Sequence, residues 1–410
     1  MRLSKTFTKT LRNAPKDETA KNGILLTRAG YIYKELAGVY DYLPLGIKVL
    51  ENIKNIIREE LNKIGCEEVA LTTLQNPELW QKTNRWDDKE VDIWFKTELS
   101  AGGELGLAPT HEEPLTNLMK TYISSYKDLP LYIYQIKDKF RNELRAKSGI
   151  LRGREFIMKD LYSFSTSEED LDAFYGKVEQ AYKNIYDRLG IGEDTYETFA
   201  SGGIFSKYSH EFQTLTEVGE DTIWQNKDKS LSFNDEVFND EVLAEFNAKK
   251  EDFTPEKACE VGNIFKLKFK YSEPLELKYI DQENKQQTVY MGCYGLGVTR
   301  VMGVIVEKTA DEKGLVWPES IAPFKFHIIA LGEKGFKKAN EIYAGNENEI
   351  LFDDREKARF GEKMSDFELM GIPYGVVISD KTLENNQVEF INRKTGEKSL
   401  LTIDEFIAKL

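Results

Sequence analysis

The stretch KDKFRNELRAKSGILRGREFIMKD, residues 137–160, concentrates positive charge in a chain that is acidic as a whole. The 410-residue chain carries a formal net charge of −14, yet seven Lys or Arg and only two acids lie between Lys137 and Arg154. Guanidinium groups bind phosphate oxygens through paired donors and keep their charge at physiological pH. The stretch therefore predicts a site for an anion.

Arg141 and Glu143 stand two residues apart on an expected strand, so their side chains should point to the same face. A loop then returns the chain to Arg152, Arg154 and Phe156. An aromatic ring beside arginines offers a face on which a nucleobase can stack. A surface hairpin with interleaved charges would explain the same residues without any ligand.

A second segment, MGCYGLGVTRVMGVIVE at 291–307, passes from an apolar run into an apolar helix. Its glycines, Gly292, Gly295 and Gly297, would let the backbone approach a ligand closely, with Arg300 nearby. No Gly-Lys-Ser/Thr follows, so this is not a Walker phosphate loop, and the glycine pattern alone is weak evidence. Tight packing of a strand against a helix would also require small residues here.

The third segment is LAPTHEEPL at 107–115. Thr110 and Glu113 have the spacing of a capping box, which predicts the start of a helix. Thr110 and Glu112 together would also suit an ammonium group, held between a hydroxyl and a carboxylate. His111 is a candidate general base only if another group orients it, and the sequence identifies no such partner.

The length and the apolar periodicity predict more than one domain, since 410 residues exceed the usual size of a single core. Long amphipathic helices are expected at 46–64 and after Ser167, surrounded by short β-rich runs. Many of these runs are joined by loops and hairpins rather than by helical crossovers. We therefore expect an α+β fold with a mixed, mainly antiparallel sheet flanked by helices.

The segment WPESIAPF, 317–324, has two prolines in eight residues and is interpreted as a linker. It would separate a large domain over 1–316 from a small α/β domain over 325–410. Within the large domain, residues 226–257 are acidic, Asn-rich and weakly periodic. We interpret them as a short solvated excursion.

Composition argues against several classes of protein. No apolar run approaches the ~20 residues that span a bilayer, and the first residues lack the apolar centre of a signal peptide, so a cytoplasmic protein is expected. The three cysteines, Cys66, Cys259 and Cys293, lie far apart, and only three histidines are present, so no zinc site is expected. The acidic balance disfavours indiscriminate nucleic-acid binding but allows a local basic face.

Taken in order and spacing, these segments resemble the motifs of class II aminoacyl-tRNA synthetases, above all prolyl-tRNA synthetases of the bacterial kind. GVYDYLPLGIKVLENIKNIIREEL with ELWQKTNRW resembles the motif 1 region, FRNE with GREFIMKDLYSF resembles motif 2, and GCYGLGVTR resembles motif 3. PTHEE is similar to the Thr-x-Glu loop of that family, while WPESIAPF and DDREKARFGEKMSDFELMGIP resemble its domain junction and anticodon-binding domain. The resemblance covers nearly the whole chain except about 226–257.

The resemblance implies a class II catalytic domain followed by an anticodon-binding domain. It implies a ligase that joins proline to ATP as prolyl-adenylate, releases pyrophosphate, and then transfers proline to the 3′ end of its tRNA. The expected partners are proline, ATP and the tRNA for proline. Mg²⁺ is expected together with ATP, and no side chain of the protein is assigned as a metal ligand.

Carried over by position, the resemblance assigns ATP to five residues of motifs 2 and 3. Arg141 would contact the α-phosphate and the proline carboxylate, and Glu143 would lie near the adenosine. Phe156 would stack on adenine, Arg152 would meet the outer phosphates, and Arg300 would hold the γ-phosphate from the other side. Arg141 and Arg300 are the expected catalytic residues.

At the amino-acid end, the resemblance implies that Thr110 and Glu112 bind the secondary amine of proline. His210, whose sequence context is ambiguous by itself, would line the same pocket. Glu260 is expected on the ATP side, although Asn263 stands where the family usually has a histidine.

Two departures from the family pattern concern assembly and fidelity. Thr72 stands where motif 1 usually has a proline of the subunit interface; a homodimer is still expected. Only 37 residues separate Thr222 from Glu260, where long bacterial members carry an inserted editing domain. That is too little for an independent hydrolytic core, so we expect no editing in cis and reliance on a separate trans-editing factor or tolerance of the error.

On the anticodon side, the expected phosphate contacts are Arg355, Lys357, Arg359 and Lys363. Acids interrupt this run, so a solvated helix face is an equal alternative. For the whole chain, the alternatives are a synthetase for threonine, glycine or histidine, and a non-catalytic paralogue that binds tRNA or a small regulator. PTHEE with GCYGLGVTR favours proline, and a regulator would not need the full set of motif 2 and motif 3 residues.

Overall fold

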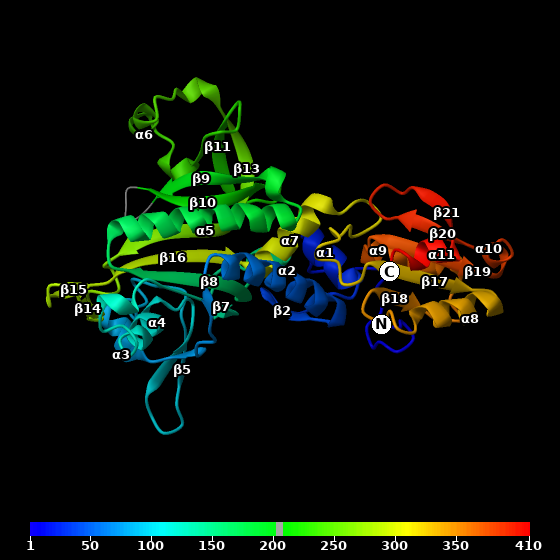
Figure 1. Cartoon of the computed structure of the whole chain (residues 1–410), viewed down its shortest axis with the longest axis horizontal. Coiled ribbons are helices and arrows are strands. Elements are labelled where there is room, and N and C mark those ends of the chain that lie inside the picture. The colour runs from blue at the N-terminus through cyan, green and yellow to red at the C-terminus, as the bar shows by residue number, and fades with distance from the viewer. Residues whose placement is uncertain (202–207) are drawn as a thin grey trace. The chain divides into compact units, whose positions relative to one another are not determined.

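The computed structural model describes residues 1–201 and 208–410 of the chain. By its internal contacts the chain divides into two units. The larger unit comprises Ala37–Val39 and Lys54–Val304, and the other comprises Met1–Leu36, Tyr40–Ile53 and Ile305–Leu410. Figure 1 labels many of the helices and strands of both units.

The larger unit is built around β-strands with few helices. Its strands are β3 (Glu67–Glu68), β4 (Leu74–Gln75), β5 (Phe95–Glu98), β6 (Glu104–Leu107), β7 (Leu131–Phe140), β8 (Glu155–Ser165), β9 (Thr195–Ser201), β10 (Tyr208–Leu215), β11 (Asp221–Asn226), β12 (Ser232–Asn234), β13 (Phe253–Lys268), β14 (Lys278–Ile280), β15 (Gln286–Thr288) and β16 (Tyr290–Gly297). Its helices are α3 (Pro77–Lys82), α4 (Glu112–Met119), α5 (Glu168–Arg188) and α6 (Asp240–Glu245), and it shares α2 (Pro44–Lys63) and α7 (Val298–Thr309) with the other unit.

Nine of these strands form one sheet in the order β10-β9-β12-β11-β13-β16-β8-β7-β3. The central pairs β7–β8, β8–β16 and β16–β13 are all antiparallel, whereas β3 pairs with β7 in parallel. The predicted α+β fold with a mainly antiparallel sheet is confirmed. None of the described helices is long and apolar enough to cross a membrane.

Helix α5 covers one face of this sheet (Figure 1). Ser167 is the N-cap of this helix, and its hydroxyl accepts a hydrogen bond from the N–H of Asp170. Serine is among the residues preferred at this position, so the start of the helix can be predicted from the sequence. Its apolar residues recur at steps of three and four, and those that the sequence pattern selects are buried, among them Leu171, Phe174 and Val178. With α5 on one face, the opposite face of the central strands is left for a ligand.

The segment 226–257 differs from the expected solvated excursion, because it is packed. It contains β12 and α6, and its buried residues Phe233, Val237, Val242, Leu243 and Phe253 form an apolar cluster against which side chains of β9, β10 and β11 also pack. These apolar residues come from several short elements and from the start of β13, so the segment as a whole keeps neither the helical nor the strand period. Periodicity could therefore not reveal the cluster.

The other unit carries a five-stranded sheet in the order β18-β17-β19-β20-β21. Its C-terminal elements are β17 (Phe326–Leu331), α8 (Gly332–Tyr343), β18 (Ile350–Asp353), α9 (Phe360–Met370), β19 (Tyr374–Ser379), α10 (Asp380–Leu383), β20 (Gln387–Asn392), β21 (Lys398–Thr402) and α11 (Ile403–Ile407). Its N-terminal elements are α1 (Lys21–Arg28), β1 (Ile32–Leu36) and β2 (Val39–Tyr42). The parallel β18–β17–β19 core and the β20–β21 hairpin agree with the small α/β domain expected there.

The expected linker 317–324 is packed within this unit. Trp317 is 3% exposed, and its indole N–H donates to the hydroxyl of Tyr31 at 3.0 Å. The chain start joins the same unit, since the Met1 ammonium donates to the carbonyl of Ile350 at 2.8 Å. Contacts between the two ends of a chain leave no local pattern, so this association was not foreseen.

Candidate functional site

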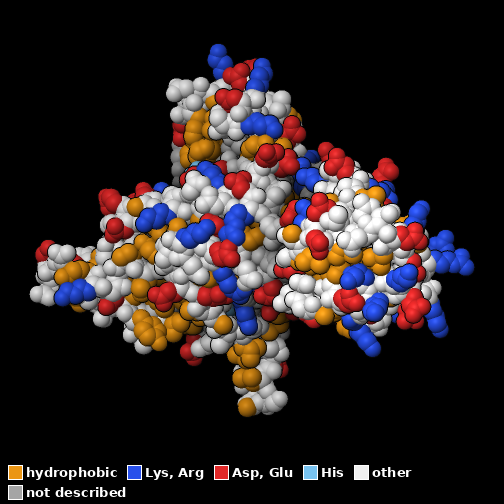
Figure 2. Space-filling model, turned by 45° about the vertical axis from the view of Figure 1, so that its right-hand side comes forward, with side chains coloured by type: hydrophobic (Ala, Val, Ile, Leu, Met, Phe, Trp, Pro, Cys, Tyr) orange, Lys and Arg blue, Asp and Glu red, His pale blue; other side chains and the backbone are white. Residues whose placement is uncertain are grey.

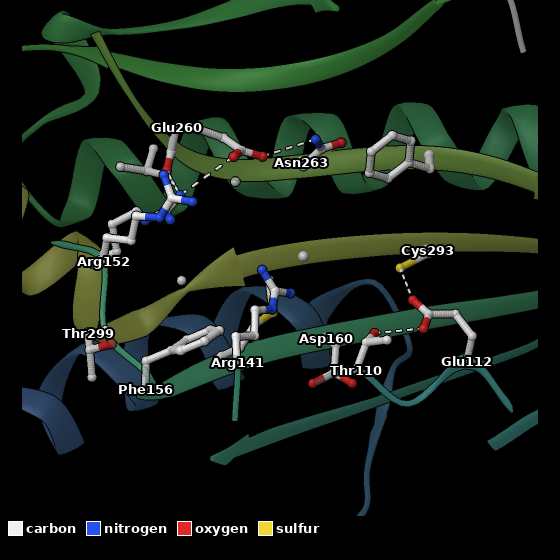
Figure 3. A pocket seen from close by; sticks show the side chains of 18 of the residues that line it. Thr110, Glu112, Arg141, Arg152, Phe156, Asp160, Glu260, Asn263, Cys293 and Thr299 are labelled. Atoms are coloured by element: carbon white, nitrogen blue, oxygen red, sulfur yellow. Dashed lines mark hydrogen bonds and ion pairs between the residues drawn. The ribbon is translucent and has the colours of Figure 1, made fainter. Parts of the chain in front are cut away.

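A cavity of about 410 Å³ lies in the larger unit, on the face of the sheet that α5 leaves uncovered. It gathers residues from the loop before α4, from β8, β13 and β16, and from the start of α7. The described residues that line it include Arg85, Thr110, Glu112, Arg141, Glu143, Arg152, Phe156, Asp160, Glu260, Asn263, Lys270, Tyr271, Cys293 and Arg300. Figure 3 shows Thr110, Glu112 and Cys293 at one end of this cavity and Arg152 and Glu260 at the other.

Strand periodicity explains which side chains of β8 enter the cavity. Phe156, Met158 and Asp160 line it, whereas Lys159 between them is buried against α5, where it bonds Tyr182. Successive side chains of a strand point to opposite faces. A charged residue and an aromatic residue of motif 2 are thus presented on one side by the pleat alone.

The glycines of β16 serve both roles that their pattern allowed. Gly295 and Gly297 line the cavity. Gly292 does not, and a Cβ there would lie 2.4 Å from the hydroxyl oxygen of Tyr294 and 2.7 Å from that of Ser163. At Gly295 and Gly297 the backbone can therefore approach a ligand closely, whereas Gly292 allows tight packing inside the protein.

Arg141 directly follows β7 instead of lying within it. The strand pairing ends at Phe140 and Glu155, so the expected placement of Arg141 and Glu143 on one strand is wrong. The Arg141 Cζ atom lies 5.2 Å from the ring centroid of Phe156, and its Nε donates to the carbonyl of Pro109 at 3.4 Å. Burial, and then the charge of Arg300, lower the pKa of Arg141. A desolvated guanidinium is thus held at the middle of the cavity.

Thr110 and Glu112 meet at the cavity end where an ammonium group was expected. Thr110 does not cap the helix, since α4 begins at Glu112, and its hydroxyl donates to Glu112 Oε2 at 2.7 Å. The thiol of Cys293 donates to Glu112 Oε1 at 3.5 Å. Burial opposes the charged form, but Arg85 and the Thr110 hydroxyl outweigh it and lower the pKa of Glu112. An ionised carboxylate with a hydroxyl beside it is suited to hold an ammonium.

Below this end lies a buried polar network that sequence analysis did not find. The Lys139 ammonium contacts Asp160 Oδ1 at 2.8 Å and His111 Nδ1 at 2.8 Å. His111 Nε2 lies 3.0 Å from the carbonyl of Thr72, which can only accept, so Nδ1 is the nitrogen that accepts from Lys139. Burial, with Lys139, lowers the pKa of His111 to about 4. His111 is a neutral structural residue and not a general base.

The opposite end of the cavity is rich in paired charges. Arg152 donates to Glu143 Oε2 at 2.7 Å and to Glu220 Oε2 at 2.7 Å. Arg300 donates to the carbonyls of Leu151 and Glu260, each at 2.8 Å. The two arginines come from motifs 2 and 3, and they line the same end of the cavity. This end can therefore receive an anion with several negative oxygens.

Glu260 also lines this end, and its Oε1 accepts from Asn263 Nδ2 at 3.0 Å (Figure 3). Asn263 Oδ1 is buried and has no hydrogen-bond partner within the described residues. Nowhere in 1–201 or 208–410 do three His, Cys, Asp or Glu side chains gather as a group that could hold a metal ion.

His210 was expected to line the amino-acid pocket, but it is not among the described residues that line the cavity. Its Nδ1 lies 2.7 Å from the hydroxyl of Tyr175 on α5, and its ring packs 4.7 Å from that of Phe199. The ring thus faces the helix-covered side of the sheet. The alternation of side chains along β10 placed it there, and the sequence did not indicate which face the cavity would occupy.

The four basic residues expected on the anticodon side separate into two kinds. Lys363 is 1% exposed, and its ammonium donates to the carbonyls of Ala330 and Asp353, so it is a structural cation and the expected phosphate contact is wrong. Arg355 is held by the carboxylates of Asp353 and Asp366. Lys357 and Arg359 are exposed.

On the face visible in Figure 2, Lys and Arg side chains alternate with Asp and Glu over the surface. The visible face therefore carries dispersed cations instead of one large basic patch.

Several residues in and around the cavity could not be identified from the sequence, and the reason is the same for each. Arg85, Asp160 and Tyr271 line the cavity but come from separate segments of the chain, and Lys139 contacts Asp160 without lining the cavity. Arg85 and Asp160 do fall within the quoted motif 1 and motif 2 text. Only the tertiary structure brings residues of these different segments to one cavity.

Two family descriptions match the chain. The tRNA synthetase class II core domain (G, H, P, S and T) matches residues 95–309, and the anticodon binding domain matches residues 325–410. A proline–tRNA ligase of Anaplasma phagocytophilum is 36% identical over 434 residues, covering 100% of both chains, and one of Ehrlichia chaffeensis is 36% identical over 426 residues with the same coverage.

Solved structures agree in fold. A Giardia lamblia prolyl-tRNA synthetase in complex with prolyl-adenylate superposes with a TM-score of 0.76 at 20% identity, covering 93% of this chain and 74% of that one. A Cryptosporidium parvum prolyl-tRNA synthetase complexed with halofuginone and AMPPNP gives a TM-score of 0.77 at 18% identity, covering 94% and 75%.

Proposed function

Because the chain belongs to the proline–tRNA ligase family, being 36% identical to a relative over the full length of both, we propose that it activates proline with ATP and transfers it to tRNA. The observation that carries this function is the arrangement of the cavity. An ionised carboxylate and a hydroxyl lie at one end, arginines lie at the other, and Arg141 lies between them.

The first step joins two anions. A carboxylate oxygen of proline attacks the α-phosphorus of ATP, and the bond to the bridging oxygen breaks, so that pyrophosphate leaves with its electron pair. Proline's carboxylate is already a nucleophile, so no general base is needed, in agreement with the neutral His111. The barrier lies in bringing like charges together in line, and fixed positioning can supply ~7–11 kcal/mol of it in favourable cases.

Each end of the cavity has a part in that positioning. Glu112 and Thr110 bind the secondary ammonium of proline, which leaves its carboxylate directed toward Arg141. Arg141 then contacts both the carboxylate and the α-phosphate, and offsets the charge that builds up at phosphorus. The Phe156 ring supports the guanidinium and offers its surface to adenine.

The outer phosphates are assigned to the arginines at the other end. Arg152 and Arg300 neutralise the departing pyrophosphate, and Glu143 lies near the adenosine. In the structure, Glu143 and Glu220 hold Arg152. Binding of a triphosphate therefore exchanges carboxylate partners for phosphate partners at this residue.

Residues at this end fit a magnesium ion bound to ATP. Glu260 supplies a carboxylate in the cavity, and Asn263 has a buried amide oxygen without a partner among the described residues. Oxygen ligands of this kind suit Mg²⁺, which is usually held by few carboxylates and by the substrate phosphates. When bound with ATP, Mg²⁺ neutralises phosphate charge.

In the second step a ribose hydroxyl at the 3′ end of the tRNA attacks the adenylate carbonyl, and AMP leaves. We assign catalysis to 1–316 and anticodon binding to 325–410, with exposed Lys357 and Arg359 as phosphate contacts. The enzyme acts in the cytoplasm as a homodimer. It lacks an editing domain between Thr222 and Glu260 and works with a separate trans-editing factor or tolerates alanine errors.

Charging of tRNA tests this function. Purified protein with ATP, Mg²⁺ and a proline tRNA transcript should attach labelled proline to the 3′ end, with little labelled threonine, glycine or histidine attached to their own tRNAs. Efficient charging with one of those amino acids instead of proline would show a different class II specificity. Binding of tRNA without charging by any of them would favour the non-catalytic paralogue.

A further inference from the structure

Arg85 lies beside the amine-binding end of the cavity, where a positive charge is unexpected. Its Nη1 is 3.4 Å from Glu112 Oε2, the carboxylate assigned to the substrate ammonium. A guanidinium at this distance competes with an ammonium for the same oxygen, and it also repels the ammonium. The site therefore requires a second negative group that pairs with the Arg85 guanidinium and offsets its charge.

Glu113 meets that requirement. Its two carboxylate oxygens accept from Arg85 Nη1 at 3.0 and 3.1 Å, shorter than the distance to Glu112. Glu113 is 0% exposed and is not among the described residues lining the cavity, and the hydroxyl of Thr83 also donates to its carboxylate, at 2.8 Å. Its buried carboxylate thus faces Arg85 from behind the cavity wall.

Aromatic rings fix Arg85 in this position. Its guanidinium carbon lies 5.0 Å from the centroid of Trp80 and 5.3 Å from that of Tyr271, and its carbonyl accepts from the indole N–H of Trp94. Arg85 is therefore held between two adjacent carboxylates of α4. The balance between these two contacts decides how much of the Glu112 charge remains for a ligand.

We propose that Glu113 is a positioning residue that sets the affinity for proline. This inference rests on the proposed function. By neutralising Arg85, it leaves the Glu112 carboxylate available to the secondary ammonium of the substrate. With both acids ionised, the three groups carry one net negative charge, which complements one ammonium. When Glu113 is neutral, the charge of Arg85 is offset by Glu112 alone, and the net charge of the three groups is zero.

The same geometry makes proline binding depend on pH. The charged or titratable groups around Glu113 are Arg85 before β5, Glu112 on α4 itself, and Lys270 and Tyr271 after β13. Burial raises the pKa of Glu113 to about 7, against the attraction of Arg85 and with repulsion from Glu112. As pH falls through 7 Glu113 gains a proton, so the KM for proline should rise on the acidic side.

Steady-state ATP–pyrophosphate exchange separates this role from a merely structural one. Glu113→Gln should raise the KM for proline by about tenfold or more and remove its dependence on pH near 7, with kcat and the KM for ATP changed by less than about threefold. Glu98→Gln, an exposed acid on the neighbouring strand β5, is the matched control and should behave as the unchanged protein.

The double variant Arg85→Met/Glu113→Gln gives the decisive readout. Removing the unbalanced cation should return the KM for proline to within about threefold of the unchanged protein, which is a non-additive result. If the double variant is no better than Glu113→Gln alone while both remain folded by thermal unfolding, Glu113 only supports the structure and the inference is overturned. An unchanged KM in Glu113→Gln would overturn it as well.

Two further outcomes keep the inference apart from the proposed function. If the unchanged protein shows no proline-dependent exchange, the proposed function fails, whatever the variants do. If Glu113→Gln does not fold, the pH profile of the KM for proline in Arg85→Met decides. Loss of the rise below pH 7 supports the role of Glu113, and an unaltered rise contradicts it.

Discussion

The guanidinium of Arg141 lies over the ring of Phe156, with Cζ 5.2 Å from the ring centroid. One residue directly follows β7 and the other lies on the adjacent strand β8, so the antiparallel pairing itself brings them together. The contact holds a cation in place before any substrate arrives, at the middle of the cavity. Preorganised charge of this kind is worth more to catalysis than charge that must move into position.

Arg141→Ala should lower the rate of proline-dependent ATP–pyrophosphate exchange by at least about a hundredfold, because the charge at the α-phosphate is no longer offset. Arg141→Lys should restore little, since an ammonium cannot contact the carboxylate and the phosphate as a planar fork does. Single-turnover formation of the adenylate measures both. A rate within threefold of the unchanged protein for Arg141→Ala would exclude Arg141 from the chemistry.

Glu112→Gln should act mainly on the amino acid. The amide keeps the shape of the side chain but removes the charge that faces the ammonium, so we expect the KM for proline to rise by about 10- to 100-fold. The KM for ATP should change little, because ATP is assigned to the other end of the cavity. A variant that loses ATP binding and proline binding equally would show that Glu112 acts on the fold of the site and not on the amine.

In the anticodon-binding domain, substitution of exposed and of buried basic residues should have different effects. Lys357→Ala with Arg359→Ala should weaken tRNA binding and reduce the slope of log affinity against log salt, by about 0.7–0.9 for each phosphate that is no longer neutralised. Lys363→Met should instead lower thermal stability, since it leaves a buried carboxylate at Asp353 with one cation fewer. Filter binding at several salt concentrations and thermal unfolding distinguish the two effects. Weaker tRNA binding in Lys363→Met without loss of stability would reverse the assignment.

The absence of an editing domain makes a prediction about fidelity. A pocket distinguishes proline from alanine poorly, because each missing methylene is worth only ~1–3 kcal/mol. The protein should therefore form some alanyl-tRNA, and hydrolysis of preformed alanyl-tRNA should be no faster with the enzyme than without it. Rapid hydrolysis by the purified protein would mean that the packed segment 226–257, or another part of the chain, carries an editing site.

The sequence indicated the regular elements well because their periodicity is strong. The long helices expected at 46–64 and after Ser167 occur as α2 and α5, among short strands. Each of these rests on residues that are close in the sequence, where pattern and structure are directly linked.

The sequence failed where distant residues meet. It could not show that Arg85 faces Glu113, that Lys139 contacts both His111 and Asp160, or that His210 lies on the side of α5. It could not show either that Lys363, which looks like a surface cation, is buried under two carbonyls. Such contacts depend on which face of a strand or helix is covered, and this is decided by tertiary packing.

The most direct test of the central claim is ATP–pyrophosphate exchange with proline, alanine, cysteine and threonine, measured on the purified, folded protein with Mg²⁺. We expect exchange that strongly favours proline, with a lower rate for alanine. No exchange with any of the four amino acids, or exchange that favours threonine, would contradict the proposed activity.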